Sequence, residues 1–313
     1  PANIAPPKPR RSRFIVKSSA KGSFITYIMI MTMLESSKVV ELFLKYDISK
    51  TNDPNRYQLA PLTGITNTSL VVEVDEKKFV LRIPGDNPDV INRESEKHNT
   101  ELVQDLGMTL PYIIFDTENG VKISEYFEIY TYKDSDFRNS ELRKNAFTEL
   151  MRLHNSGLKF KNNFTPMEVF KNIADETNML EKEAKEIGEE VISKINEIGI
   201  NELPCHQDLF PGNFIIFKDK TYLIDWEYSS MGDNYFDYAD LFWQNSFDYD
   251  STLRKQSLEE LGISTVQEVE KFEYFEILSM ITWGLWALRR SPNDNDGLMA
   301  LNQAKEQIKN KKL

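Results

Sequence analysis

The sequence "CHQDLFPGNFIIFKDKTYLIDWEY", residues 205–228, places a histidine, an aspartate and an asparagine before one apolar run and a second aspartate after another. The two runs are rich in β-branched and aromatic residues and are joined by a polar turn at 218–220, which predicts a β-hairpin. Because an antiparallel hairpin brings the outer ends of its strands together, we expect Asn213 and Asp225 to lie side by side.

The polar side chains at the ends of this hairpin suit phosphoryl transfer. The oxygens of Asn213 and Asp225 are hard ligands of the kind that Mg²⁺ prefers. Asp208 lies upstream of this pair, where its carboxylate can orient a hydroxyl group and accept its proton. The simpler interpretation is an ordinary polar turn. The hairpin spacing to Asp225 and an arginine on a predicted strand, Arg82, weigh against it.

The regions before and after residue 128 differ in their expected secondary structure. Strands are expected at 70–74, 79–83, 111–115 and 121–127, where apolar and β-branched residues form short runs. Helices are expected at 36–48, 87–107, 139–157, 167–197, 236–246, 251–261, 266–290 and 296–311. A β-rich part followed by a larger helical part indicates an α+β fold, with an N-terminal lobe at 35–127 and a C-terminal lobe at 128–313.

The first 34 residues do not match the rest of the chain. They contain six basic residues and no acidic one, and they end in the apolar run "FITYIMIMTML". This run is too short to span a bilayer. We expect 1–34 to be a disordered or non-native extension that is not part of the fold, with a targeting peptide as the alternative.

Composition limits the classes of partner. The 313 residues carry a formal net charge of −11, which disfavours nucleic-acid binding because that binding depends on clustered Lys and Arg. We expect a small-molecule substrate, no nucleic-acid partner and no integral membrane segment. The single cysteine, Cys205, cannot form an internal disulfide, which fits a reducing compartment and a cytoplasmic location. We interpret it as a small buried residue.

The pattern H-x-D-x-x-x-x-N at 206–213, followed by Asp225 at the end of the next strand, resembles the catalytic loop and metal-binding aspartate of the protein-kinase-like small-molecule kinases. This superfamily includes the aminoglycoside phosphotransferases and the choline and ethanolamine kinases. The resemblance covers roughly residues 35–313 and is closest to bacterial choline kinases. It implies a protein-kinase-like fold of two lobes that binds ATP and Mg²⁺.

The resemblance also implies roles for the residues of the hairpin region. Asp208 is implied to be the catalytic base or orienting carboxylate, and Asn213 and Asp225 are implied to hold Mg²⁺. His206 is implied to brace the loop. "WGLWAL", at 283–288, is similar to the choline kinase segment that supplies tryptophans to the choline site.

For ATP, the resemblance implies a phosphate-covering loop, a cation with an acidic partner, and a hinge that meets adenine. The implied residues are Gly64, Thr66, Asn67, Arg82, Glu96, Glu125 and Phe127. Arg82 stands where protein kinases have a lysine, and its partner is Glu96 or, as the alternative, Glu94. The loop contains a single glycine, so as a glycine-rich motif it is weak.

The candidate acceptor site is aromatic. Trp283 and Trp286 are three residues apart and share one face of a predicted helix. Two tryptophans in a buried helix are usually core residues, but aromatic rings beside acidic residues also bind quaternary ammonium groups. The candidate substrate-binding residues are Tyr228, Asp240, Gln244, Trp283 and Trp286, with Asp237 as a further acid and Phe247 and Tyr249 as further walls.

Three functions remain open at this point. The first is an ATP-dependent choline kinase. The second is a kinase of the same fold that acts on ethanolamine, thiamine or an aminoglycoside. The third is a non-catalytic binding module, which predicts the loss of Asp208, Asn213 or Asp225, although all three are present. The sequence does not indicate an oligomeric state.

Overall fold

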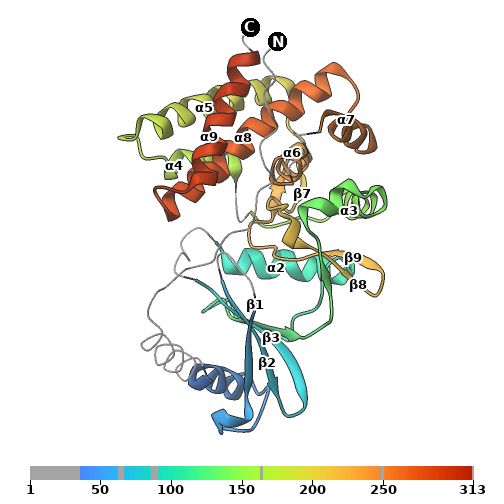
Figure 1. The fold of residues 1–313 in the computed structure, drawn as a ribbon, viewed down its shortest axis with the longest axis vertical. Coiled ribbons are helices and arrows are strands. Elements are labelled where there is room, and N and C mark those ends of the chain that lie inside the picture. The colour runs from blue at the N-terminus through green and yellow to red at the C-terminus, as the bar shows by residue number, and fades with distance from the viewer. Residues whose placement is uncertain are drawn as a thin grey trace. The chain divides into compact units, whose positions relative to one another are not determined.

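The computed structural model describes residues 36–62, 67–85, 91–162, 165–245, 247 and 250–311 (Figure 1). The expected N-terminal extension, the loop residues Gly64 and Thr66, and Tyr249 lie outside the described residues. Contacts divide the chain into two compact units. The first unit comprises Pro1–Asp86 and Tyr112–Tyr126, and the second comprises Asn87–Pro111 and Phe127–Leu313. The expected lobe boundary near 128 remains a prediction.

The first unit is built on a five-stranded antiparallel sheet in the order β1-β2-β3-β5-β4. Its strands are β1 (Gln58–Leu62), β2 (Thr68–Val74), β3 (Lys77–Ile83), β4 (Ile114–Phe115) and β5 (Lys122–Glu125). Side chains of β2 alternate between buried and partly exposed, and Leu70, Val72 and Val74 pack in a core with Phe43 of a helix at 36–45. The predicted strands at 70–74 and 79–83 are confirmed within β2 and β3.

The second unit is mainly helical. Its helices are α2 (Arg93–Asp105), α3 (Ser140–His154), α4 (Pro166–Ile173), α5 (Met179–Ile198), α6 (Asn234–Gln244), α7 (Ser251–Glu260), α8 (Val266–Arg290) and α9 (Asn295–Lys311). Helix α8 packs against α4, α5, α6 and α9, which explains why its sequence from 277 to 288 is apolar nearly all round (Figure 1). The stretch 167–197 forms two helices, because α4 ends at the extended residue Ala174 and Asn178 caps α5.

Two small sheets complete the second unit. The predicted hairpin is confirmed as β8 (Phe214–Phe217) and β9 (Lys220–Leu223), with β6 (Tyr130–Thr131) on the other side of β8. The strands β7 (Leu203–Cys205) and β10 (Ser230–Gly232) pair with each other. Lys218 and Asp219 both have positive φ, as a two-residue hairpin turn requires. Single turns of 3₁₀-helix occur at Pro54–Arg56, Asp134–Arg138 and Pro211–Asn213.

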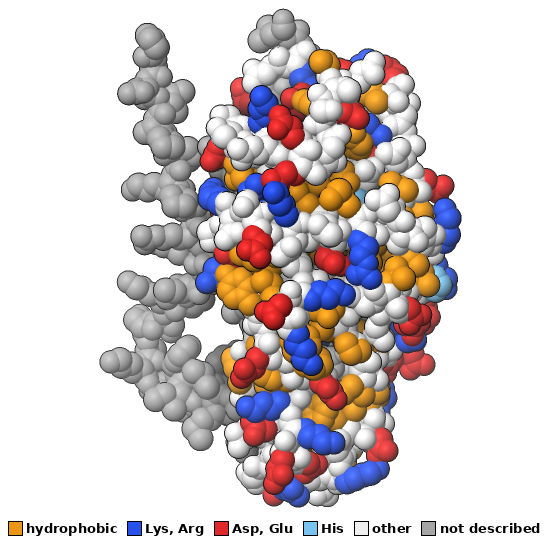
Figure 2. Space-filling model, turned by 90° about the vertical axis from the view of Figure 1, so that its right-hand side faces the viewer, with side chains coloured by type: hydrophobic (Ala, Val, Ile, Leu, Met, Phe, Trp, Pro, Cys, Tyr) orange, Lys and Arg blue, Asp and Glu red, His pale blue; other side chains and the backbone are white. Residues whose placement is uncertain are grey.

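The surface mixes charges of both signs. On the face drawn in Figure 2, acidic and basic side chains are interspersed over the described residues, with smaller hydrophobic areas between them. Among the helices of the described part of the chain, none combines the length and the apolar character that crossing a membrane requires.

Helices α8 and α9 approach closely at two glycines. A Cβ added at Gly297 would lie 2.9 Å from the carbonyl oxygen of Gly284, which is backbone and has little freedom to move. We therefore expect Gly297→Ala to lower the free energy of unfolding by about 1–3 kcal/mol through overpacking. Urea unfolding followed by circular dichroism measures this change.

Asn302→Ala, on the exposed part of α9, is the matched control and is expected to change the unfolding free energy by less than about 0.5 kcal/mol. Equal stability of the Gly297→Ala variant and the parent would contradict the close approach of the two helices.

Candidate functional site

Residues 206–213, which we call the polar loop, connect β7 to β8. The loop ends in the 3₁₀ turn Pro211–Asn213, where proline fixes the first backbone angle of the turn. The N–H of Ile224 donates to the carbonyl of Asn213 at 3.0 Å. This bond continues the pairing of β8 and β9 by one step. The backbone of Asn213 is therefore next to the residue before Asp225, which agrees with the predicted hairpin.

The amide group of Asn213 is oriented by Asp208. Its Nδ2 donates to the carbonyl oxygen of Asp208 at 2.8 Å and to the Oδ2 of the Asp208 carboxylate at 3.0 Å. Since the amide nitrogen faces Asp208, the amide oxygen is the Asn213 atom that can act as a cation ligand. Asp225 has a φ of 68°, which is a left-handed backbone conformation. This conformation is uncommon for residues other than glycine, and where it occurs it is often at functional sites.

His206 ties the polar loop to the end of the hairpin. Its Nε2 donates to the carbonyl of Ile224 at 3.0 Å, and its Nδ1 accepts the N–H of Asp208 at 3.3 Å. Only the neutral ring with a proton on Nε2 satisfies both bonds. Burial lowers the pKa of His206, which also favours the neutral form. These contacts support a bracing role for His206.

Two buried carboxylates of α6 bind the backbone of the polar loop. Asp237 accepts the N–H of His206 on Oδ2 at 2.9 Å and the N–H of Gln207 on Oδ1 at 2.7 Å. Asp240 accepts the N–H of Leu209 on Oδ2 at 2.7 Å. The two aspartates are three residues apart and therefore share one face of the helix. The N–H groups of the residues on both sides of Asp208 are thus bound by α6.

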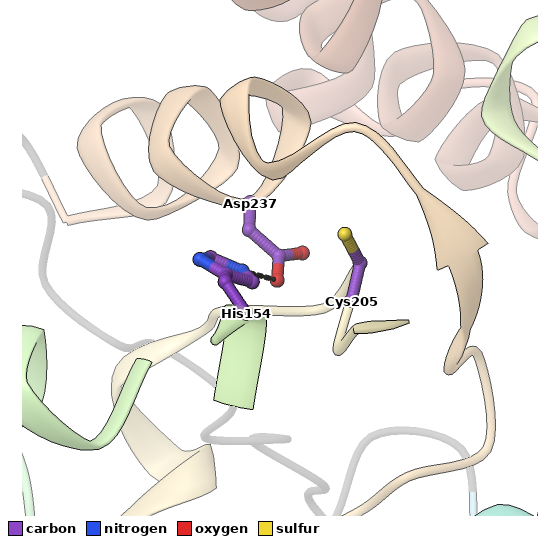
Figure 3. Close-up of side chains that lie close together, drawn as sticks. All are labelled: His154, Cys205 and Asp237. Carbon is purple, nitrogen blue, oxygen red and sulfur yellow. Dashed lines mark hydrogen bonds and ion pairs between the residues drawn. The ribbon is translucent and has the colours of Figure 1, made fainter. Parts of the chain in front are cut away.

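Figure 3 shows Asp237 pointing from α6 toward His154 and Cys205. The Nε2 of His154 lies 2.8 Å from Oδ2 of Asp237, and all three side chains are buried. Burial, and then the negative charges of Asp237 and Asp233, raise the pKa of the Cys205 thiol and keep it neutral. Both oxygens of Asp237 accept hydrogen bonds from backbone N–H groups, and one of them also contacts His154. The Asp237 carboxylate therefore anchors the polar loop to α6.

Asp240 and Gln244, two of the expected substrate-binding residues, lie under the polar loop. Oδ1 of Asp240 accepts from Ser279 at 2.8 Å and from Gln244 at 3.3 Å, and the Asp240 side chain is fully buried. Burial raises the pKa of Asp240 to about 7, while its hydrogen bond from Leu209 opposes that shift. This placement indicates that Asp240, together with Gln244, helps to position the polar loop. A contact between either residue and a substrate remains a prediction.

A second group of carboxylates surrounds the end of β9. Carboxylate oxygens of Glu96, Asp225 and Glu227 lie within 4.8 Å of one another. Arg93 binds Glu96 at 2.8 Å and lies 3.5 Å from Glu227. Burial, and then the charges of Asp240, Asp225 and Glu227, raise the pKa of Asp208 well above its usual range. This density of negative charge and hard oxygen donors fits a divalent cation such as Mg²⁺.

The candidate nucleotide-binding residues are divided between the two units. Asn67 directly precedes β2, Arg82 lies on β3 opposite Lys122 of β5, and Glu125 ends β5 with its side chain exposed. Phe127 belongs to the second unit, where its ring lies 4.8 Å from that of Phe217. Arg82 is in the first unit, whereas Glu96 and Glu94 are on α2 in the second, so the pairing of Arg82 remains a prediction.

Three aromatic rings, one at Tyr228 and two on α8, form a cluster. The centroid of Tyr228 lies 5.0 Å from that of Trp283 and 6.4 Å from that of Trp286, and the two tryptophans are 5.7 Å apart. Each pair is nearly perpendicular, at 77–86°. We call these residues the aromatic cluster. Trp283 is buried, whereas Trp286 is only partly buried, so the cluster is not a closed core.

Phe247 does not join the aromatic cluster. Its ring stacks on Phe242 at 4.5 Å and on Phe147 at 6.4 Å, within the main helical core. The sequence could not separate these two clusters, because an aromatic residue after a helix can pack on either side. Asp237 was expected as a further acid of the acceptor site, whereas both its oxygens bind the polar loop and His154. The sequence did not indicate the contacts of Glu227 and His154. Two aspartates on an otherwise apolar helix face were the available signal for Asp237.

The chain was compared with known proteins. A family model described as choline/ethanolamine kinase matches residues 61–272. The protein LicA of Haemophilus influenzae is 29% identical over 194 residues, which are 56% of this chain and 55% of that protein. The chain thus spans about half the length of this curated relative.

Solved structures are also similar to this chain, among them two of LicA. The choline kinase LicA from Streptococcus pneumoniae superposes with a TM-score of 0.74 and 26% identity, covering 86% of this chain and 99% of that one. A structure of LicA in complex with AMP gives a TM-score of 0.73 and 25% identity, covering 88% of this chain and 98% of that one.

The anchoring by Asp237 can be tested by removing its charge. In Asp237→Asn, the amide NH₂ replaces one oxygen and faces a backbone N–H, so a buried donor loses its acceptor. We expect the free energy of unfolding to fall by about 2–4 kcal/mol, measured by urea unfolding.

Asp250→Asn is the control, because Asp250 is an exposed N-cap of α7 and asparagine caps helices equally well. An Asp237→Asn protein as stable as this control would rule out the anchoring role.

Proposed function

Because the chain belongs to the choline/ethanolamine kinase family, we propose that it is an ATP-dependent kinase that transfers the γ-phosphate of ATP to the hydroxyl group of choline. The family match to 61–272 covers more than half of the chain. The expected family and the expected protein-kinase-like α+β fold are confirmed by this match and by the similar solved structures. The acceptor and the roles of individual residues are the proposal.

One observation carries the proposed chemistry. Asn213 binds the carboxylate of Asp208 with its amide nitrogen, and its backbone carbonyl binds the residue before Asp225. Asn213 thus binds the side chain of Asp208 and the backbone next to Asp225, which supports a common site for the three residues. In-line transfer needs positioning and charge neutralisation more than covalent chemistry, and a pre-positioned set of this kind supplies both.

In this proposal Asp208 orients the acceptor hydroxyl and takes its proton as the oxygen attacks phosphorus. His206 stays neutral and holds the loop. Asn213 and Asp225 would hold Mg²⁺, with Glu227 as a further oxygen donor, and the bound ion would offset the charge of the phosphates. The raised pKa of Asp208 favours the protonated acid until positive charge enters the site, so a bound cation also favours the carboxylate form that accepts a proton.

The residues proposed to bind the nucleotide lie in the first unit and in the hinge. Arg82 would contact the ATP phosphates, Asn67 would belong to the loop that covers them, and the backbone at Glu125–Phe127 would meet adenine. The similar LicA structure in complex with AMP supports a nucleotide at this fold. A cytoplasmic location fits the use of ATP and a free, buried Cys205.

The aromatic cluster favours choline over a primary amine. The three rings lie within 6.4 Å of one another, and ring faces attract a quaternary ammonium group without needing hydrogen bonds from it. Ethanolamine carries N–H donors and would bind better to carboxylates. A kinase of ethanolamine, thiamine or an aminoglycoside on the same fold is the alternative.

An assay with ATP, Mg²⁺ and a panel of acceptors tests the proposal. We expect phosphorylation of choline with a higher kcat/KM than for ethanolamine, thiamine or an aminoglycoside. We expect Asp225→Asn to lower kcat at least about 100-fold, because it removes a charged metal ligand.

Asp219→Asn is the matched control for this assay. Asp219 lies at the opposite end of the same hairpin, is exposed and also has positive φ, so the variant should keep parental activity. Turnover of another acceptor but not of choline would overturn the substrate assignment. Near-parental activity of Asp225→Asn would overturn the metal assignment.

Trp286→Leu tests the acceptor site. Loss of one cation–π contact worth about 0.5–2 kcal/mol should raise the KM for choline by about 2–30-fold, with a smaller change in kcat. The neutral isostere 3,3-dimethylbutan-1-ol serves as the control acceptor, since its binding lacks the charge term. An equal rise in KM for both acceptors would show that the ring contributes only packing.

A further inference from the structure

Trp286 already carries a cation of the protein itself. The guanidinium carbon of Arg290 lies 4.7 Å from the centroid of the Trp286 ring. The two residues are one turn apart on α8, and such i,i+4 neighbours meet on a helix surface. Arg290 is exposed and Trp286 is partly buried, so this contact lies at the solvent side of the aromatic cluster.

The charge of Arg290 also acts on Tyr228, a second member of the aromatic cluster. The pKa of Tyr228 is raised by burial first, then by the carboxylates of Glu227, Asp208 and Asp225, and the positive charge of Arg290 acts in the opposite direction. The ring of Tyr228 lies 6.4 Å from that of Trp286. Negative charges near the polar loop and the positive charge of Arg290 on α8 therefore both act on Tyr228.

A second cation can meet Trp286 in two ways. It can displace the guanidinium from the ring face, which costs an existing cation–π contact, or it can bind beside Arg290 against its positive charge. Both ways weaken the binding of a cation. A neutral molecule of the same shape that displaces the guanidinium loses the same contact, but it meets no repulsion from Arg290, so the binding of the cation is weakened more.

We propose that Arg290 is a specificity-determining residue, an internal cation that competes with the ammonium group of the acceptor for the face of Trp286. This inference rests on the proposed function, in which the aromatic cluster receives a cationic alcohol. Arg290 would set how tightly the acceptor is held and how strongly a charged acceptor is preferred over a neutral one.

The competing explanation is a helix-end effect. Basic residues in the last turn of a helix interact favourably with its C-terminal dipole, and α8 ends with two of them, Arg289 and Arg290. Arg289 has the same charge, the same exposure and nearly the same position. Arg289→Met therefore removes a helix-end charge and serves as the matched control for Arg290→Met.

The experiment measures binding directly, by the change in tryptophan fluorescence and by calorimetry. The ligands are choline, tetramethylammonium and the neutral 3,3-dimethylbutan-1-ol. Arg290→Met keeps an unbranched apolar side chain on Trp286 but removes the charge. We expect it to lower the Kd of both cations by about two- to fivefold, the equivalent of one exposed cation–π contact. The Kd of the neutral alcohol should change less, and Arg290→Lys and Arg289→Met should resemble the parent.

Unchanged or weaker cation binding by Arg290→Met, or tighter binding of the neutral alcohol by the same factor, would overturn the inference. Failure of the parent and the variant to bind tetramethylammonium would overturn it as well. Tetramethylammonium has no hydroxyl group, so its binding does not depend on turnover. Tighter binding without phosphorylation of any acceptor supports the inference and refutes the proposed kinase activity. Choline turnover with unaltered binding by Arg290→Met refutes the inference alone.

Discussion

Backbone N–H groups of the polar loop donate to two buried carboxylates on α6, and the arrangement of the other site residues depends on these bonds. Asp237 binds the N–H groups of His206 and Gln207, and Asp240 binds that of Leu209. With the backbone fixed on both sides, Asp208 has little freedom except at its own side chain. Asn213 then reaches Asp208 from the far end of the loop.

Burying these carboxylates is costly, and the surrounding groups explain how the cost is met. A charged group removed from water must recover its lost hydrogen bonds inside the protein. Asp237 recovers them from two backbone N–H groups and His154. Asp240 recovers them from Leu209, Ser279 and Gln244, yet burial still raises its pKa to about 7. Burial thus makes Asp240 easier to protonate than an ordinary aspartate, although it binds the loop.

The hairpin could be predicted from the sequence, whereas the carboxylates that bind the polar loop could not. Strand periodicity and the turn at 218–220 predicted β8 and β9, and the pairing placed Asn213 beside the residue before Asp225. Asp237 could not be assigned in the same way, because its partners are backbone groups 30 and 31 residues away that no residue type identifies. Phe247 was misplaced for a related reason, since its ring fits either of two aromatic groups and only the packing of α6 selects one.

Residues 225–228 connect the two halves of the proposed chemistry. Asp225 and Glu227 contribute to the carboxylate group, Trp226 packs on His206 with ring centroids 4.6 Å apart, and Tyr228 contacts Trp283. The proposed metal ligand Asp225 and the proposed acceptor-binding ring of Tyr228 therefore lie three residues apart on one segment. Because that segment is fixed to the polar loop through the bond from His206 to Ile224, its position relative to Asp208 is set by hydrogen bonding rather than by side-chain packing alone. In the proposed function, the backbone that positions Asp208 therefore also positions an acceptor bound at Tyr228.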